Sequence, residues 1–268
     1  MMSIKRITVI GGDKRLKTAV KVLCEKGFTV NTVGLYDDEN GNIADGDVLL
    51  LPVPTTKDGE SVFAPFAKRK IYLSEVADKA DNRLLLTCNY SFSGKNCIDY
   101  GKLDSYSLLN AVPTAEGAIK LAIENTSFTL WQSRVLVIGF GRVGKVLADR
   151  LKALGAYVTV SARKPADFAL IKALGYDTIE TKTVSNSLSD YDIVFNTVDV
   201  KVIDEKAFEN CTVRLLIDLS SAGGFDLSHA RDCGIQALKA PGLPGITAPL
   251  TAGKILAETV TEILSSYI

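Results

Sequence analysis

The sequence is poor in the residue types that metal sites and disulfide frameworks need. Its 268 residues include one histidine, His229, and five scattered cysteines, no two of which form a Cys-x-x-Cys pair. A structural zinc site takes clustered Cys and His ligands, so we expect no bound metal. An odd, dispersed set of cysteines is typical of reduced thiols, and we expect a cytoplasmic protein.

The sequence also lacks an excess of either charge and lacks long apolar runs. Lys plus Arg and Asp plus Glu both number 31, whereas a protein that binds nucleic acid through its overall field is usually basic. No apolar run approaches the roughly 20 residues that span a bilayer. Met1 to Lys5 leads directly into a strand-like segment, so we expect no signal peptide. These features exclude nucleic acid and membranes as expected partners.

Short apolar strands alternating with helices dominate what is present. Ile7–Ile10 predicts a strand that ends in the turn Gly11-Gly12-Asp13, and Ala19, Val20 and Leu23 predict the helix that follows. Nearly continuous apolar strands are typical of a parallel sheet covered on both faces. Further strands of this first series are predicted at 28–33, 48–51, 71–73 and 84–87.

A second series of the same kind follows a long helix that we expect to begin near Pro113 and to run towards Phe128. The pattern predicts an α/β fold with two doubly wound, Rossmann-like parallel-sheet domains and an interdomain cleft. We expect a substrate-side domain over 1–112 and a cofactor-binding domain over 113–268, and the last helix, about 250–268, could pack back on the first domain. Strands of the second series are predicted at 135–138, 157–160, 193–195 and 215–217, with helices at 143–154 and 250–264.

The turn Gly139-Phe140-Gly141-Arg142-Val143-Gly144 carries the strongest chemical signal. It lies between an apolar strand and a helix, which is the setting that a dinucleotide-binding turn requires. There, Gly139 permits the tight turn, Gly141 admits the pyrophosphate and Gly144 lets helix and strand pack closely. The helix N-terminus would receive the phosphates. The alternative is a glycine turn that binds nothing.

The next strand end favours NADP over NAD. An NAD site usually has an Asp or Glu here, but this chain has Ser161-Ala162-Arg163-Lys164. Ser161 can donate a hydrogen bond to a 2′-phosphate, and Arg163 can pair with it. The alternative is a solvated loop beside a bound NAD. With the other strand ends, the predicted cofactor-binding residues are Gly139, Gly141, Arg142, Val143, Gly144, Ser161, Ala162, Arg163, Lys164, Asn196, Thr197, Val198, Asp218 and Pro241.

Several motifs together resemble the dipicolinate synthase family of A subunits, nearly end to end. The most specific is the run Ala240-Pro241-Gly242-Leu243-Pro244-Gly245-Ile246, which continues to Gly253. Ser161 departs from the pattern, since the family has glycine there. The resemblance implies an oxidoreductase that oxidises dihydrodipicolinate to pyridine-2,6-dicarboxylate in sporulation, with a flavoprotein-like second subunit; we also expect an oligomer. The other markers are Gly11-Gly12-Asp13-x-Arg15, Val112-Pro113-Thr114-Ala115-Glu116-Gly117 and the glycine turn itself.

Such a substrate needs groups that bind two carboxylates and a group that accepts a proton. Short hydroxyl side chains and helix N-termini suit carboxylates, and Thr114 and Glu116, at the expected start of the long helix, are the predicted catalytic residues. Glu116 could instead be an acid interacting with the helix dipole, and Arg15 could be a solvated cation. The predicted substrate-binding residues are Gly12, Asp13, Arg15, Thr55, Asn89, Ser93, Ser220 and Ser221.

Other activities of this architecture are less well supported. A hydroxyacid dehydrogenase would use a histidine as acid and base, but His229 lies in what reads as a surface helix. A reductase of the shikimate dehydrogenase type would use a lysine, and Lys57, Lys95 and Lys120 are candidates. A non-catalytic, NADP-sensing subunit of a flavoprotein complex is the remaining alternative.

Overall fold

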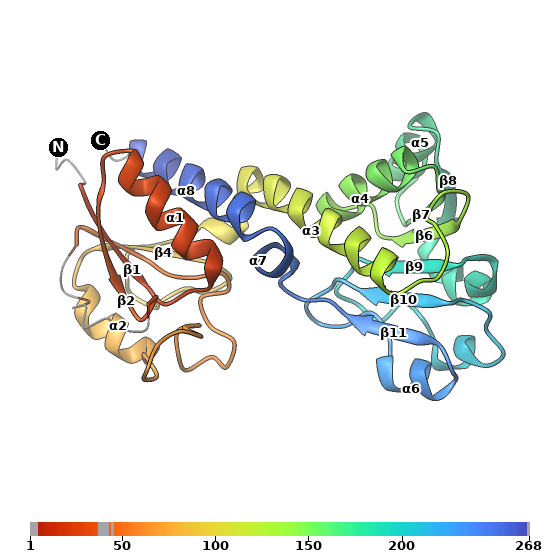
Figure 1. Ribbon diagram of the computed structural model, residues 1–268, viewed down its shortest axis with the longest axis horizontal. Helices are drawn as coiled ribbons and strands as arrows, with labels where there is room; N and C mark the ends of the chain where they lie inside the picture. The colour runs from red at the N-terminus through yellow and green to blue at the C-terminus, as the bar shows by residue number, and fades with distance from the viewer. Residues whose placement is uncertain (1–4, 37–42, 44–45, 267–268) are drawn as a thin grey trace. The chain divides into compact units, whose positions relative to one another are not determined.

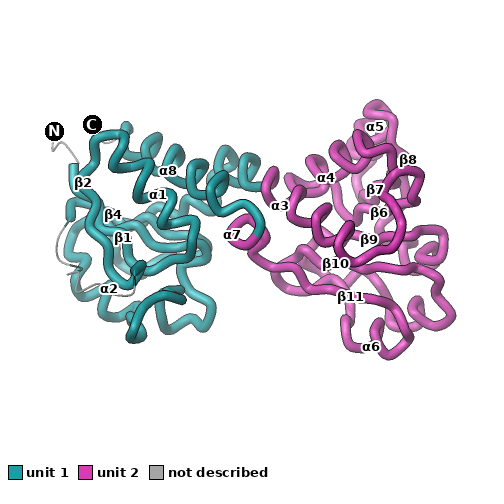
Figure 2. The backbone as a smooth tube through the Cα atoms, viewed as in Figure 1, with its two compact units in different colours: residues 1–110, 247–268 teal, residues 111–246 magenta. Residues whose placement is uncertain are grey.

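The computed structural model describes residues 5–36, 43 and 46–266. The chain forms two compact units, Met1–Asn110 with Thr247–Ile268 (unit 1) and Ala111–Ile246 (unit 2) (Figure 2). The expected division placed the boundary after residue 112 and left open where the last helix packs. In the structure, that helix is part of unit 1.

Unit 1 is built on a five-stranded parallel sheet with the order β2-β1-β3-β4-β5. Loops at the carboxyl ends of these strands contain the predicted residues Gly12, Thr55 and Asn89. The strands are β1 (Arg6–Ile10), β2 (Thr29–Val33), β3 (Val48–Leu50), β4 (Leu84–Thr87) and β5 (Cys97–Asp99).

The two faces of this sheet bury alternate residues of each strand. Val48 and Leu50 pack on the side of α1 (Lys14–Glu25) and α8 (Pro249–Ser265). Leu49 and Leu51 pack on the side of α2 (Leu73–Ala80). Side chains of a strand alternate between faces, so a continuous apolar run is what burial on both faces requires.

Helix α8, which is late in the sequence, packs against α1, which is early in it. It lies beside α1 (Figure 1), and its residues Leu256, Val260 and Leu264 belong to the core of unit 1. Gly253 permits the close approach, because a Cβ atom there would lie 2.5 Å from the carbonyl oxygen of Arg15 and 2.5 Å from Cβ of Thr18.

Unit 2 has a six-stranded parallel sheet with the order β11-β10-β9-β6-β7-β8. The order reverses between β6 and β9, at the strand that ends in the glycine turn. The strands are β6 (Arg134–Ile138), β7 (Tyr157–Ala162), β8 (Asp177–Glu180), β9 (Ile193–Asn196), β10 (Leu215–Asp218) and β11 (Gln236–Lys239).

Helices cover both faces of this sheet as well. Val135 and Val137 face the core that includes buried residues of α3 (Asp104–Glu124), α4 (Arg142–Ala153) and α5 (Pro165–Ala173). Leu136 and Ile138 face the 3₁₀ helices η2 (Thr181–Asp190) and η3 (Glu205–Phe208) with α6 (Leu227–Asp232). The remaining short helices are η1 (Tyr100–Lys102) and α7 (Leu243–Thr247). The predicted fold class is confirmed.

Two predicted elements are wrong. The long helix does not begin near Pro113 but at Asp104, and it contains Pro113 in its interior. A proline inside a helix removes one backbone hydrogen bond, and the buried small residues around it, Ala111 and Ala115, show that packing sustains the helix there. Residues 71–73 form no strand, because Leu73 begins α2 and packs with Val76 and Ala80 at helical spacing.

Three strands were missed, namely β5, β8 and β11, and each lies at an edge of its sheet. Their residues are mostly half-buried or exposed, so they do not form the apolar runs that reveal central strands. In the part of the chain that the structure describes, no helix is both long and apolar enough to cross a membrane.

We predict that Gly253→Ala destabilises unit 1 by about 1–3 kcal/mol, because its methyl group would overlap α1. Urea denaturation would measure the change, with Lys254→Ala, at an exposed neighbouring position, as the control. A gain of roughly 1 kcal/mol, which alanine gives in an unhindered helix, would contradict the close packing of α1 and α8.

Candidate functional site

The glycine turn connects β6 to α4, and two of its glycines are required by the protein's own packing. Gly139 has a positive φ of 99°, and a Cβ atom there would lie 2.7 Å from Oγ1 of Thr197. A Cβ atom on Gly144 would overlap the carbonyl oxygen of Gly139. These two positions therefore fix the tight turn and the close contact of helix and strand.

Gly141 differs from both, because a Cβ atom there would meet no protein atom within 4 Å. Its φ of −79° is one that any residue adopts. Packing therefore gives no reason for glycine at this exposed N-cap position of α4, where a side chain would have space. A ligand that approaches the backbone closely would give one.

A cavity of about 760 Å³ opens beside this turn. It extends from the turn past the ends of β7 and β8 to the loop after β9. Among the predicted cofactor-binding residues it is lined by Gly139, Gly141, Ser161, Ala162, Arg163, Lys164 and Val198; its other lining residues are Phe140, Asp167, Glu180, Thr181, Lys182, Ser185, Val200, Lys201, Val202 and Asp204.

The cations around this cavity differ in how they are paired. Lys182 lies 2.7 Å from Glu180, and Lys201 lies 2.7 Å from Glu205. Arg163 and Lys164 are exposed, and neither forms an ion pair with any residue in the described ranges. Arg163 is thus the cation best able to receive an anionic ligand at the end of β7.

Ser161 has a structural task that was not expected from the sequence. It is fully buried, and its Oγ accepts a hydrogen bond from the Gly139 amide at 3.2 Å. The hydroxyl also contacts Oγ1 of Thr181 at 3.2 Å, which in turn donates to the carbonyl of Ala162. Ser161 therefore ties the glycine turn to β7 and β8, and its hydroxyl is engaged inside the protein.

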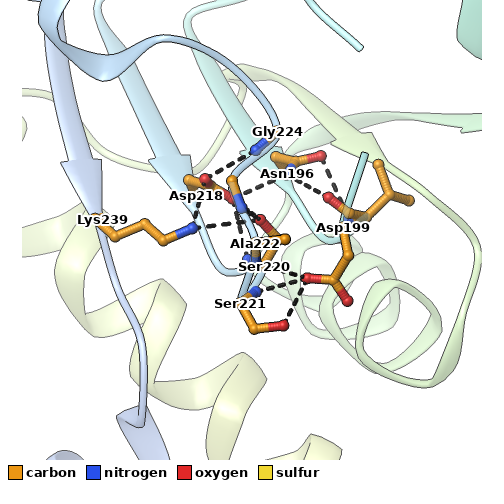
Figure 3. A network of polar contacts seen from close by, with 10 residues as sticks. Asn196, Asp199, Asp218, Ser220, Ser221, Ala222, Gly224 and Lys239 are labelled. Carbon is orange, nitrogen blue, oxygen red and sulfur yellow. Dashed lines mark hydrogen bonds and ion pairs between the residues drawn. The ribbon is translucent and has the colours of Figure 1, made fainter. Parts of the chain in front are cut away.

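A second cluster of polar residues lies at the ends of β9, β10 and β11 (Figure 3). Asn196, Asp218 and Lys239 occupy matched positions on these neighbouring strands. Asn196 and Asp218 are fully buried, whereas 29% of the Lys239 side chain is exposed. Nζ of Lys239 lies 2.8 Å from Oδ2 of Asp218, and Nδ2 of Asn196 lies 2.8 Å from Oδ1.

Asp218 also organises the loop that follows β10. Its carboxylate accepts hydrogen bonds from the amide and hydroxyl of Ser220 and from the amide of Gly224. Burial raises the pKa of the Asp218 carboxyl, but the bonds from Lys239, Ser220 and Asn196 outweigh burial and hold the pKa below its ordinary value. A buried carboxylate with this many donors stays ionised.

Asp199 holds the other side of the same loop (Figure 3). It accepts from the amide and hydroxyl of Ser221, at 2.7 and 2.8 Å, and from the amide of Ala222. These bonds hold the pKa of Asp199 below its ordinary range, although burial opposes them. The hydroxyls of the predicted substrate-binding residues Ser220 and Ser221 thus donate their hydrogen bonds to Asp218 and Asp199, respectively.

In unit 1, Arg15 is buried, so the alternative that it is a solvated cation is wrong. It is 4% exposed, and its Nε and Nη2 atoms pair with the carboxylate of Asp13, with Nη2 2.8 Å from Oδ2. Nη2 also donates to the carbonyl of Val53. Burial lowers the pKa of Arg15, but Asp13 outweighs burial and raises it above its ordinary value. The pair is therefore charged.

The other predicted substrate residues of unit 1 differ in burial. Gly12 is buried and its amide donates to the carbonyl of Phe63. Thr55 is fully buried, and its hydroxyl accepts from the amide of Cys88. Asn89 and Ser93 are exposed. A cavity of about 440 Å³ in this unit is lined instead by Lys57, Asp58, Ser61, Val62, Phe63, Ala64, Pro65, Ala67, Lys68, Arg69, Lys70 and Ile71.

The predicted catalytic residues are not at a helix start. Because α3 begins at Asp104, Thr114 and Glu116 lie in its interior, so the predicted interaction of Glu116 with the N-terminal dipole is wrong. The exposed Glu116 carboxylate pairs with Nε of Arg150, in the last turn of α4, at 3.2 Å. That turn is at the opposite end of α4 from the glycine turn. Neither residue lines the large cavity.

Among the polar residues that hold these sites together by hydrogen bonds, Lys239, Asp199 and Thr181 were missed from the sequence. Lys239 directly precedes the Ala240–Gly253 run, so the run was the one available signal. Its strand β11 has the half-polar sequence Gln236-Ala237-Leu238-Lys239 and was not predicted. His229 lies on the short helix α6, as expected from the sequence, and its side chain is half-buried.

Comparison with known proteins shows the family. Over 99% of its length the chain is 33% identical to the A subunit of dipicolinate synthase from Bacillus subtilis (strain 168), covering 97% of that protein. The chain belongs to the dipicolinate synthase family of A subunits. Residues 6–91 match the family described as the N-terminal domain of the dipicolinate synthase A subunit, and residues 127–221 match one described as Putative NAD(P)-binding.

Solved structures agree with this membership. Crystal structures of the dipicolinate synthase A subunits from Bacillus halodurans and Bacillus subtilis superpose with TM-scores of 0.88 and 0.86 at 30% and 31% identity. They cover 98% and 99% of this chain, which covers 99% and 97% of theirs. A pyruvate reductase of Chlamydomonas reinhardtii, 16% identical with a TM-score of 0.65 over 98% of this chain and 96% of its own, shares the fold. Together these findings support an oxidoreductase linked to a nicotinamide cofactor.

We predict that Asp218 makes stability depend on pH. Its folded pKa is below that of the unfolded chain, so its contribution is complete above the unfolded value of about 3.9 and is lost as pH falls through the folded value. At neutral pH, Asp218→Asn should lower the free energy of unfolding by about 1–3 kcal/mol. This difference from the unaltered protein should become smaller as the pH is lowered. Urea denaturation of both proteins at neutral and acidic pH would measure the difference in unfolding free energy. A difference that does not change with pH would contradict an ionised Asp218.

Proposed function

We propose that the protein oxidises dihydrodipicolinate to dipicolinate with NADP during spore formation, as one subunit of a two-subunit enzyme. The observation that carries the proposal is the end-to-end similarity to the Bacillus subtilis protein named as the A subunit of dipicolinate synthase. The name of that relative implies a second subunit, and we extend the implication to this chain. The flavoprotein-like nature of the partner rests on the resemblance alone.

The residues of unit 2 fit a dinucleotide. The open space at Gly141 is the place that a side chain would fill and a pyrophosphate would occupy. The amides at the start of α4 and the positive end of that helix suit the phosphates. The order of the sheet reverses between β6 and β9, and ligands of doubly wound sheets bind at such a reversal, outside the carboxyl ends of the strands.

NADP is favoured over NAD by the charge at the end of β7. Arg163 lines the cavity and is exposed, with Lys164 beside it. A 2′-phosphate would supply the anionic partner that Arg163 and Lys164 do not have among the described residues. Ser161 supports this assignment only indirectly, because its buried hydroxyl holds the turn and the strand together.

The chemistry requires little of the chain beyond positioning. Oxidation removes a hydride and a proton from the dihydropyridine ring, and the bound nicotinamide supplies the hydride acceptor. Because the product is aromatic, the main tasks of the protein are to orient the ring and to bind its two carboxylates. The catalytic role of Thr114 and Glu116 stays a prediction, and the Glu116 carboxylate is paired with Arg150.

We further propose unit 2 as the cofactor unit and unit 1 as the substrate side. Arg15 supports this role as a buried cation in the first turn of α1, next to the loop that follows β1. Its Nε and Nη2 atoms are held by Asp13 and Val53. Asp13 thus fixes the direction of the guanidinium, as a binding residue requires.

The activity itself is tested with freshly formed dihydrodipicolinate and NADP, by following the absorbance of the reduced cofactor. We expect turnover by the chain, either alone or with its flavoprotein-like partner subunit. No turnover in both cases would refute the oxidation. NADP binding without turnover in either case would support a non-catalytic sensing subunit in its place.

We predict that Arg163→Ala weakens NADP binding about 10- to 100-fold, the size of a lost hydrogen-bonded contact to a charged group. NAD lacks the 2′-phosphate, so its dissociation constant should change little. Calorimetric titration of both cofactors would measure the two effects, with Lys172→Ala, an exposed lysine on α5, as the control. Equal losses for NADP and NAD would refute the preference.

A further inference from the structure

Lys239 is the cation of the polar cluster, and it is partly open to solvent. Asp218 and Asn196, its neighbours in register on β10 and β9, are fully buried. The Lys239 side chain is 29% exposed. Asn196 is also in register with Ile138, the last residue before the glycine turn. The cluster therefore lies along the same edge of the sheet as the glycine turn, on the side away from Arg163.

The Asn196 amide group and the two serine hydroxyls of the cluster already donate their protons within the protein. Nδ2 of Asn196 donates to Asp218 and to the carbonyl of Val198, at 2.8 and 2.9 Å. The Ser220 hydroxyl donates to Asp218 at 2.6 Å, and the Ser221 hydroxyl donates to Asp199 at 2.8 Å. An anionic ligand needs donors, and these serine hydroxyls, which were predicted to bind substrate, have none to offer.

Lys239 retains a donor. An ammonium has three N–H groups, and Nζ contacts Oδ2 of Asp218 at 2.8 Å and Oγ of Ser220 at 3.4 Å. Asp218 does not depend on Lys239 alone, because Asn196, the amide and hydroxyl of Ser220 and the amide of Gly224 also donate to it. The ammonium thus keeps one N–H group and part of its charge for a ligand.

We propose that Lys239 binds one carboxylate of the dicarboxylate substrate, and that Asp218 is the positioning residue that holds the ammonium at the end of β11. This inference rests on the proposed function, which supplies a ligand with two carboxylates. Arg163 and Lys239 then bind anionic groups on opposite sides of the glycine turn, one belonging to the cofactor and the other to the substrate.

The test measures binding of the product, pyridine-2,6-dicarboxylate, to the protein saturated with NADP, by calorimetric titration. Lys239→Gln should weaken product binding about 10- to 100-fold, as expected for the loss of a charged donor. Lys239→Arg should retain most of the affinity. The dissociation constant of NADP should stay unchanged in both variants, and Lys172→Gln, which removes an exposed positive charge on α5, is the matched control.

A double variant separates binding from simple neutralisation of Asp218. Asp218→Asn combined with Lys239→Gln leaves no uncompensated buried charge. If Lys239 binds the product, the double variant also binds it weakly when it is saturated with NADP. Recovery of product affinity in the double variant, or full affinity in Lys239→Gln, would overturn the inference and leave the proposed function standing. If the unaltered protein binds NADP but not the product, the substrate assignment fails, and the inference fails with it.

Discussion

Burial of parallel strands on both faces is the constraint on which the rest of this structure depends. Val48–Leu50 in one sheet and Leu215–Ile217 in the other have no exposed side, so neither strand can place a polar group along its length. In these two strands a charged side chain is left to the strand end, where Asp218 follows Ile217. Because all the strands of a sheet run in one direction, their carboxyl ends share an edge. Residues as distant in sequence as Gly141 and Lys239 meet the solvent along that edge, and a site forms there without any further arrangement.

Charged groups at such an edge are partly buried, and each has a partner that keeps it charged. Asp218 pairs with Lys239 in unit 2, and Arg15 pairs with Asp13 in unit 1. Removing one partner of a buried pair costs far more than the pair itself stabilises. The main effect of each pair is therefore to hold the side chain of its cation in one orientation. The more buried partner is the carboxylate of Asp218 in unit 2 and the guanidinium of Arg15 in unit 1. Each of these two also forms hydrogen bonds with the backbone.

The sequence was most informative where burial and backbone geometry leave little choice. The central strands are continuous apolar runs, and the glycine turn is legible because Gly139 and Gly144 have no space for a side chain. Edge strands such as β11 are half-exposed and carry no such pattern, so Lys239 was missed together with its strand. Pro113 misled the prediction of α3, because tertiary packing sustains a helix on both sides of it. Ser161 and Ser220 were correctly placed at strand ends, but which atoms receive their hydroxyl protons depends on Thr181 and Asp218, about 20 and 2 residues away.

The packing of α8 on α1 has a consequence for how the protein comes into being during synthesis. One face of the N-terminal sheet is completed by Leu256, Val260 and Leu264, which a ribosome adds after every residue of unit 2. The 136-residue segment Ala111–Ile246 has its own sheet and its own cores, and can close while the chain is still growing. Unit 1 is therefore the first unit to enter translation but the second to complete its fold. Until α8 arrives, the nascent protein exposes the apolar face of α1, which makes it a substrate for chaperones that bind exposed hydrophobic surface.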